Sequence, residues 1–249
     1  PHRIFNGGVR YDHKIRHDKR HLNTFSPRVS LVWLPNAVIS LKGTYAHSFV
    51  DAPFFYRASQ IAIFSGGSEL NPEKMDSYQL GMSFNWQPLH LKYDLNLFYN
   101  QVKDLVYYNT GTDADTSDGN TFTNAGNIDM GGVENSLQYT TASTLANLNF
   151  TFQYPFKVKN FSSTEHTVSN VPKFLLNLTA AQKCYERKRL GKLWARAHMH
   201  FQSSVQCLNN DILKKMVLGT QLVTDRQSEY AVFGAGIEWQ APFGLDVSI

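Results

Sequence analysis

Residues 91–100 read LKYDLNLFYN, a stretch in which apolar and polar side chains alternate. One set is apolar and the other is polar: Leu91, Tyr93, Leu95, Leu97 and Tyr99 against Lys92, Asp94, Asn96 and Asn100. Because successive side chains of a β-strand point to opposite faces, this alternation predicts a strand with one apolar face and one polar face.

The same alternation recurs in three other segments, at residues 147–154, 173–180 and 195–207. Four runs reach the ~9 to 11 residues that a tilted strand needs to cross a membrane: residues 37–50, 73–87, 89–109 and 190–207. Strands of soluble β-sandwiches are usually shorter, with turns every ~8 to 12 residues. The apolar sets carry no charged side chain, as a lipid-facing surface requires. About eleven strands are expected in all.

The connections between these runs alternate between tight and long. Tight turns are predicted at Pro35-Asn36, Gln87-Pro88, Ser143-Thr144, Arg189 to Gly191 and Pro242 to Gly244. Long segments are predicted at residues 12–24, 51–72, 109–121, 155–170 and 208–228. Outer-membrane barrels have this asymmetry, with short periplasmic turns and longer extracellular loops.

Three tryptophans fall within a few residues of the tight turns: Trp33, Trp86 and Trp239. An aromatic girdle at a membrane interface would occupy these positions. The sequence therefore predicts an all-β fold, an antiparallel transmembrane β-barrel whose wall has about eleven strands over residues 1–249. The strongly polar second face indicates that the parent barrel is larger than this segment.

Composition agrees with this interpretation. Aromatic residues make up 13% of the 249 residues, and no window approaches the ~18 uncharged apolar residues of a spanning helix. The net charge of +4 comes from clusters at predicted turns and loops, such as Arg16 to Arg20 and Arg187 to Lys192, rather than from a surface with interleaved aromatics. No nucleic-acid partner is expected.

Several strings resemble those of TonB-dependent outer-membrane receptors. They are Gly7 to Asp12 with Phe25 to Val29, Tyr45 to Phe49 with Asp51 to Pro53, Glu69 to Glu73 with Ser77 to Gly81, Leu97 to Tyr99 with Lys103 to Leu105, and Asn124 to Gly126 with Gly132 to Glu134. Their order and spacing over residues 7–134 carry the resemblance, and the weaker alternation over 135–249 continues it.

The resemblance implies a barrel of about 22 strands, closed by an N-terminal plug. It implies outer-membrane lipid around the barrel and active uptake of a nutrient ligand such as a ferric siderophore, haem, cobalamin or an oligosaccharide. Energy would come from the TonB complex through the plug. This sequence has no counterpart of the plug or of the closing strands, and both of its ends read as strands that have been cut.

The segment 51–72 is unusually apolar for an exposed loop. Its candidate substrate-contact residues are Phe54, Phe55, Tyr56 and Arg57, because aromatic faces stack on ligands and an arginine pairs with an anionic group. The alternative is a loop that folds inward and packs on its own side chains, among them Ile61, Ile63 and Phe64.

The pattern gives weaker support for a functional role of the other polar residues. Arg196, His198 and His200 share a predicted lumen-lining face, for which polarity alone is sufficient reason. His13, His17 and His21 would align on a helix as metal or haem ligands, but the basic residues among them favour a solvated loop. Asp113, Asp115 and Asp118 lack the glycine and terminal glutamate of a helical calcium loop. No metal site, no cofactor and no disulfide between Cys184 and Cys207 are predicted.

The sequence also allows two alternative functions from other classes. One is a soluble or surface β-sandwich that binds a ligand. The other is an outer-membrane barrel hydrolase with a serine and a histidine at the lumen rim, although the sequence contains no G-x-S-x-G, H-E-x-x-H or C-x-x-C motif and no phosphate loop. A transport component without a catalytic site is the favoured reading.

Overall fold

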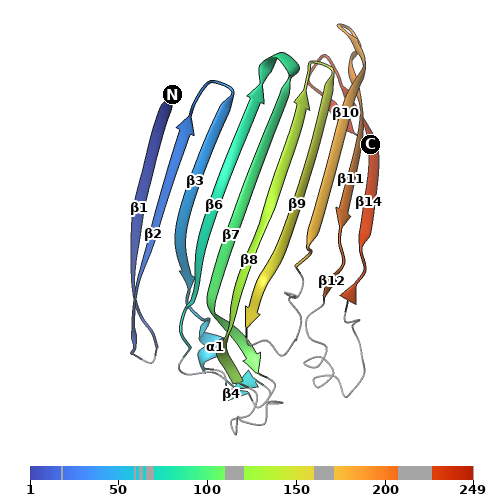
Figure 1. Ribbon diagram of the computed structural model, residues 1–249. Helices are drawn as coiled ribbons and strands as arrows, with labels where there is room; N and C mark the ends of the chain where they lie inside the picture. The colour runs from blue at the N-terminus through green and yellow to red at the C-terminus, as the bar shows by residue number, and fades with distance from the viewer. Residues whose placement is uncertain are drawn as a thin grey trace.

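The fold is a single long sheet of antiparallel strands, seen in a computed structural model (Figure 1). The structure describes residues 1–17, 19–58, 60–61, 64–65, 70–109, 121–159, 171–206 and 226–248. Eleven strands follow one another across the sheet: β1 His2–Ile15, β2 His21–Leu34, β3 Ile39–Val50, β6 Glu73–Trp86, β7 Leu91–Asn109, β8 Thr121–Thr140, β9 Thr144–Lys159, β10 Phe174–Arg187, β11 Gly191–Gln202, β14 Tyr230–Gln240 and β15 Asp246–Ser248.

Shorter elements lie between the long strands. They are α1 Phe54–Ala58, β4 Gln60–Ile61, β5 Phe64–Ser65, the 3-10 helix η1 Gln87–Leu89, β12 Val205–Gln206 and β13 Arg226–Gln227. Strands β4 and β5 pair with each other, and β5 pairs in parallel with β8 through Ser65 and Thr121. Strands β12 and β13 form a separate two-stranded ribbon. Among the described helices, none has the length and apolar character needed to cross a membrane.

The sequence predicted most of these boundaries to within two residues, and all five tight turns are confirmed. We call the end of the strands at which these turns lie the turn end of the sheet, and the opposite end of the strands the loop end. The predicted long loop 12–24 is wrong, because β1 continues to Ile15 and β2 begins at His21. The loop predicted from residue 155 is also misplaced, since β9 continues to Lys159, and β11 ends at Gln202 rather than at residue 207.

The register confirms the two-faced strands. Directly paired residues lie on the same face, and the apolar set of β7 pairs with apolar residues of β6: Trp86 with Leu91, Phe84 with Tyr93, Met82 with Leu95 and Leu80 with Leu97. The polar set pairs likewise, as in Ser83 with Asp94. We call these two surfaces the apolar face and the polar face. Asn135 lies on the apolar face, where its side-chain oxygen accepts a hydrogen bond from the Tyr93 hydroxyl at 2.5 Å.

The apolar face has the height of a membrane. On β6 it runs from Trp86 to Tyr78. Eight residue steps at about 3.3 Å give about 26 Å along the strand and, at a tilt of ~40°, about 20 Å along the barrel axis. With the side chains added, this approaches the ~25 Å apolar band of outer-membrane barrels.

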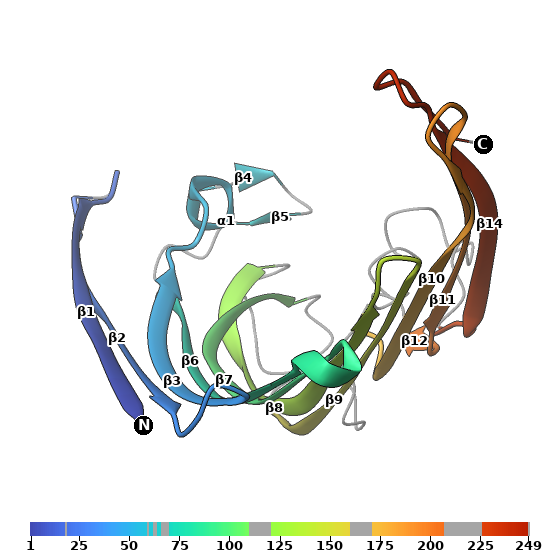
Figure 2. The ribbon, with the colours of Figure 1, turned by 90° about the horizontal axis from the view of Figure 1, so that it is seen from above.

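The sheet curves into an open arc when it is seen along the strands (Figure 2). The segment with α1, β4 and β5 lies on the concave side of this arc. A β-sandwich has two sheets packed face to face with a core between them. The described residues instead form one large curved sheet and the small β12–β13 ribbon, with only small buried clusters. The soluble sandwich considered from sequence is therefore wrong.

Candidate functional site

The two ends of the connection between β3 and β6 are packed against neighbouring strands. Ala52 and Leu70, at its two ends, are buried together with Phe122 of β8, and Val106 of β7 packs against them. Asn71 and Asn124 add two hydrogen bonds. The backbone N–H of Asn71 donates to the side-chain oxygen of Asn124 at 2.7 Å, and the side-chain nitrogen of Asn124 donates to the backbone carbonyl of Asn71 at 3.0 Å. These contacts fix both ends of the connection on the loop ends of β7 and β8.

The short helix α1 presents aromatic rings above this packed base. The Tyr56 ring stacks on Phe122 with a centroid separation of 4.3 Å, and Phe55 meets the same ring edge-on at 6.4 Å. Phe54 lies 5.4 Å from the ring of His17, which belongs to the tip of the β1–β2 hairpin. Phe54 and Phe55 nevertheless keep 57% and 47% of their surfaces exposed. Two of the predicted contact residues are thus open to solvent, while Tyr56 is anchored.

A buried carboxylate ties the β1–β2 hairpin to the same segment. Asp51 accepts hydrogen bonds from Arg16 at 2.5 Å and from Lys14 at 2.7 Å, and Arg16 also donates to the carbonyl of Leu70 at 3.0 Å. Burial by itself would raise the pKa of Asp51, but the hydrogen bonds and charges of Lys14 and Arg16 outweigh burial and hold the pKa below its usual range. Asp51 is therefore ionised at neutral pH.

Arg57 points into this ion cluster. Its side chain is only 9% exposed, with Nη2 at 4.0 Å from Asp51 and Nε donating to the Ala52 carbonyl at 3.1 Å. The sequence offered Arg57 as a partner for an anionic ligand. In the structure its guanidinium lies beside Asp51 instead, so Arg57 helps to hold the segment. Ile63 lies outside the described residues, as do the side chains of Ile61 and Phe64.

Arg196, His198 and His200 lie together on the polar face of β11. Arg196 forms an ion pair with Glu238 of β14, and His200 Nδ1 lies 2.7 Å from the side-chain oxygen of Asn177. The imidazole of His198 covers Gly234, where a Cβ atom would lie 2.1 Å from Cε1 of the ring. All three side chains are partnered within the wall. Their role as a lumen lining remains a prediction.

A second polar cluster occupies the polar face near the middle of the sheet. Asn96 donates to Glu134 at 3.0 Å, Ser83 donates to Asp94, and Lys92 lies 2.9 Å from Asp94. Lys42 and Asn149 line the same shallow recess of about 420 Å³. The alternation pattern identified the β7 members of this cluster, but Glu134 was missed because the sequence alone does not align β8 with β7.

The tryptophans predicted for the girdle all lie at the turn end on the apolar face. Trp33 pairs with Leu41, Trp86 with Leu91 and Trp239 with Leu193. The indole of Trp239 donates to the carbonyl of Leu190 at 2.7 Å, which keeps its polar edge next to the turn. This placement is what an interfacial girdle needs, although their contact with the lipid interface remains a prediction.

A second belt of aromatic residues follows the loop end of the same face and was not recognised from sequence. Tyr45, Tyr78, Tyr99 and Tyr154 lie on β3, β6, β7 and β9, with neighbouring rings of the first three at 5.1 and 6.3 Å. Phe156 bridges the last two, at 6.4 Å from Tyr99 and 5.8 Å from Tyr154. Because the rings come from four different strands, only the register reveals the belt.

The three histidines of the first hairpin do not align as metal ligands. They lie on β1, at the tip and on β2, with the rings of His13 and His21 stacked at 5.4 Å and His17 against Phe54. Within the described part of the chain, no three His, Cys, Asp or Glu side chains gather at a metal-binding distance. Cys184 is a free, exposed thiol. Cys207, Asp113, Asp115 and Asp118 lie outside the described residues.

Comparisons with known proteins agree with this architecture. The profile of the family described as TonB dependent receptor-like, beta-barrel, matches residues 4–249. The ferric-catecholate import receptor Fiu from E. coli K12 has a similar structure, with a TM-score of 0.73 at 15% identity over 99% of this chain and 37% of its own. The FrpB iron transporter from Neisseria meningitidis gives 0.71 at 15% identity, also over 99% and 37%.

The copper transporter OprC gives a TM-score of 0.73 at 14% identity, over 99% of this chain and 38% of its own. Identities this low show the fold alone, and the chain spans well under half of each of these structures. A comparison with curated protein sequences gives no match. The family profile, however, covers almost every residue, and the long antiparallel strands with segregated turns and loops are those of its barrels. The chain therefore belongs to the TonB-dependent receptor-like β-barrel family, whose members are proteins of the bacterial outer membrane.

Proposed function

We propose that this chain forms wall and external loop surface of an outer-membrane receptor that imports a scarce nutrient. Barrels of this family are parts of transport receptors that bind nutrient ligands and interact with TonB, and they are not enzymes. The candidate substrates are a ferric siderophore, haem, cobalamin and an oligosaccharide. Energy would reach the receptor from the TonB complex through a plug domain.

The observation that carries the substrate-binding part of this proposal is the packed segment around α1. An aromatic surface binds a ligand well when the rings are held in place before binding, because less conformational entropy is lost. Tyr56 is stacked on Phe122, and the ion cluster at Asp51 holds the backbone on either side of it. Phe54 and Phe55 are therefore exposed rings on a fixed base, at the loop end and on the concave side of the arc (Figure 2).

The experiment is ligand binding to the full-length receptor in detergent, measured by titration calorimetry. The panel contains a ferric catecholate, a ferric hydroxamate, haem, cobalamin and a maltodextrin. We expect one of them to bind saturably, and Phe54→Ala with Phe55→Ala to weaken that binding about ten- to a hundred-fold, as the loss of aromatic anchors does. Phe243→Ala, which removes an exposed ring at the turn end, is the matched control.

Two results would contradict the proposal. If the Phe54/Phe55 double variant binds as tightly as the Phe243→Ala control, α1 is no part of the substrate site. If no member of the panel binds saturably to a correctly folded receptor, nutrient import of these classes is the wrong function.

A further inference from the structure

The apolar face contains a recess at Gly131, beside the loop-end aromatic belt. Its wall includes Tyr99, Phe152, Tyr154 and Phe156, and its volume is about 560 Å³. The recess exists because position 131 has no side chain. A Cβ atom there would lie 2.7 Å from the Phe156 ring and 3.1 Å from the carbonyl oxygen of Phe98.

The rings that line the recess are available to a ligand from the lipid side. Phe152 and Phe156 are exposed, and register places Phe152 and Tyr154 on the same apolar face as Leu97 and Tyr99. In an outer-membrane barrel this face meets lipid acyl chains. A recess of this kind at the border of the apolar band therefore fits the part of an acyl chain that lies next to the lipid headgroup.

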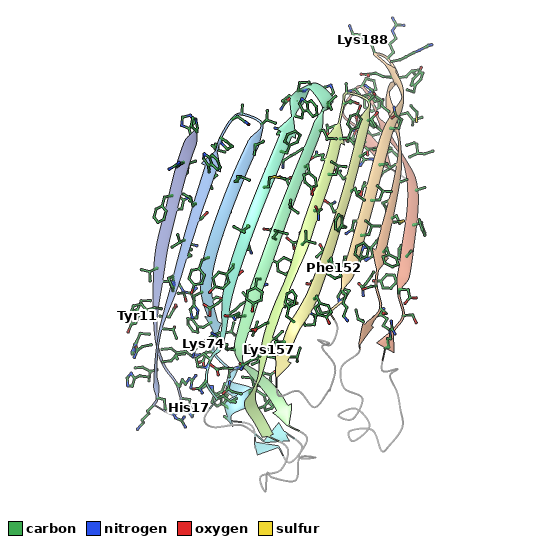
Figure 3. All side chains as sticks on the ribbon, viewed as in Figure 1. Tyr11, His17, Lys74, Phe152, Lys157 and Lys188 are labelled. Carbon is green, nitrogen blue, oxygen red and sulfur yellow. The ribbon has the colours of Figure 1, made fainter. Side chains whose placement is uncertain are left out.

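The outward-facing side chains change from aromatic to polar or charged immediately beyond the recess. Tyr45 is followed on its face by His47 and Tyr78 by Asp76, and the register shift at Phe156 puts Lys157 next to it on this face. Such a change marks the level at which hydrocarbon gives way to lipid headgroups. Figure 3 shows Lys157 nearer the loop end than Phe152, at about the height of Lys74, with Lys188 at the opposite end of the sheet.

Two ammonium groups border the recess on its headgroup side. Lys173 Nζ lies over the Tyr154 ring, 5.1 Å from its centroid, and Lys157 adjoins Phe156 and is exposed. Other lysines of this region are already paired: Lys74 with Asp104 at 3.3 Å and Lys103 with Asp76 at 3.6 Å. Among the described residues, neither Lys157 nor Lys173 forms an ion pair, although Asp129 is the backbone neighbour of Lys157 across the sheet.

We propose that the Gly131 recess binds one phosphate-bearing lipid of the surrounding leaflet. The acyl chain would lie against Phe152 and Phe156, and the phosphate between the ammonium groups of Lys157 and Lys173. Ammonium groups attract anionic headgroups at a membrane surface, and the Tyr154 hydroxyl adds a hydrogen-bond donor at the same level. This lipid site lies on the opposite face from the polar lining and does not depend on the identity of the imported substrate.

The test uses the full-length receptor in detergent and native mass spectrometry. Dioleoyl phosphatidic acid is the probe, and dioleoylglycerol, with the same chains and no phosphate, is its control. We expect one tightly held phosphatidic acid per receptor and no retained dioleoylglycerol. Lys157→Gln with Lys173→Gln is expected to weaken the binding about thirty-fold, because each lysine near a headgroup contributes about a five-fold factor.

Lys188→Gln with Arg189→Gln, at the turn end, is the matched charge control and should leave binding unchanged. Phe156→Ala tests the apolar wall through an exposed residue and should shorten the retention of the lipid. Folding of every variant is checked by the heat-dependent shift of the barrel on a gel. Equal retention of the two lipids, equal effects of the two double variants, or a protein rather than a lipid bound at this face would each overturn the proposal.

Discussion

The guanidinium of Arg16 and the carboxylate of Asp51 form an ion pair of 2.5 Å, and each side chain is only 7% exposed. The pair connects the tip of the first hairpin to the segment that follows β3. Exposed ion pairs contribute little to stability, but removal of one partner from a buried pair leaves an uncompensated charge that costs about 3–5 kcal/mol. Asp51 therefore holds the base of the aromatic surface formed by α1.

Replacement of Asp51 by Asn should loosen this segment without unfolding the sheet. Lys14, Arg16 and Arg57 would then face one another without a carboxylate, and we expect the local opening free energy to fall by about 3 kcal/mol. Hydrogen exchange of the amides of α1, including the Tyr56 amide that donates to the Pro53 carbonyl, should accelerate about a hundred-fold.

Asp12→Asn is the control for the loss of a charge at an exposed position. Asp12 pairs with Arg10 at 2.6 Å, with both side chains open to solvent. Its replacement should therefore change the local opening free energy of α1 by less than about 1 kcal/mol. Equal acceleration in the two variants would show that Asp51 has no special role in holding the segment.

Acid should have the same effect as the Asp51→Asn variant. The pKa of Asp51 is lowered in the folded protein, so its ionisation stabilises the packed segment at pH values above the ordinary aspartate pKa of ~3.9. This contribution is lost progressively as the pH falls from ~3.9 through the lowered pKa of the folded state. The protection of the α1 amides against hydrogen exchange should fall over this range in the unsubstituted protein but not in Asp51→Asn. Equal pH dependence of protection in both would show that ionised Asp51 does not hold the segment.

Two glycines with positive φ allow backbone strain to be separated from steric overlap. Gly191, at φ +84°, begins β11, and a Cβ atom there would lie 2.0 Å from the carbonyl oxygen of Gln240. At Gly244, with φ +87°, a Cβ atom would have no other atom within 4 Å. Gly244→Ala should cost only the left-handed penalty of about 1–2 kcal/mol. Gly191→Ala should cost clearly more, because β11 must move away from β14.

The measurement is the urea midpoint of barrel unfolding in lipid vesicles, with refolding checked for reversibility. If both alanine variants lose the same stability, the sheet absorbs the overlap at Gly191 and only the backbone conformation matters. If Gly244→Ala is the less stable of the two, the assigned turn geometry is incorrect.

Alternation was sufficient to predict the strands where one face meets lipid. Along β7, Leu91 to Tyr99 had to be apolar at every second position, so the period was visible without a structure. The pattern disappears toward the loop end, where neither face needs apolar residues. The sequence pattern therefore predicts a loop at His13, Lys14 and His21, although these residues continue β1 and β2.

Contacts between distant strands account for what the sequence did not reveal. Arg57 and Asp51 are close in sequence, but the ion cluster around Asp51 is completed by Arg16, which comes from the first hairpin and also donates to Leu70. The recess at Gly131 likewise depends on the pairing of β8 with β9 and on the additional residue where β9 shifts register between Pro155 and Lys157. A single sequence does not reveal which residues of two strands pair with each other, whereas the alternation within each strand reveals its two faces.

The opposite character of the two faces can be tested at two consecutive residues of β7. Leu97 lies on the apolar face next to the Tyr99 position, and Asn96 lies on the polar face beside Glu134. An arginine in the lipid-facing band costs about 2–4 kcal/mol at the midplane and less toward the interfaces, so Leu97→Arg should lower stability by about 2 kcal/mol. Asn96→Arg places the same charge one residue away, where Glu134 can pair with it, and should change stability by less than about 1 kcal/mol. Urea titration of the receptor refolded in vesicles measures both, and an equal loss in the two variants would mean that Leu97 does not face lipid.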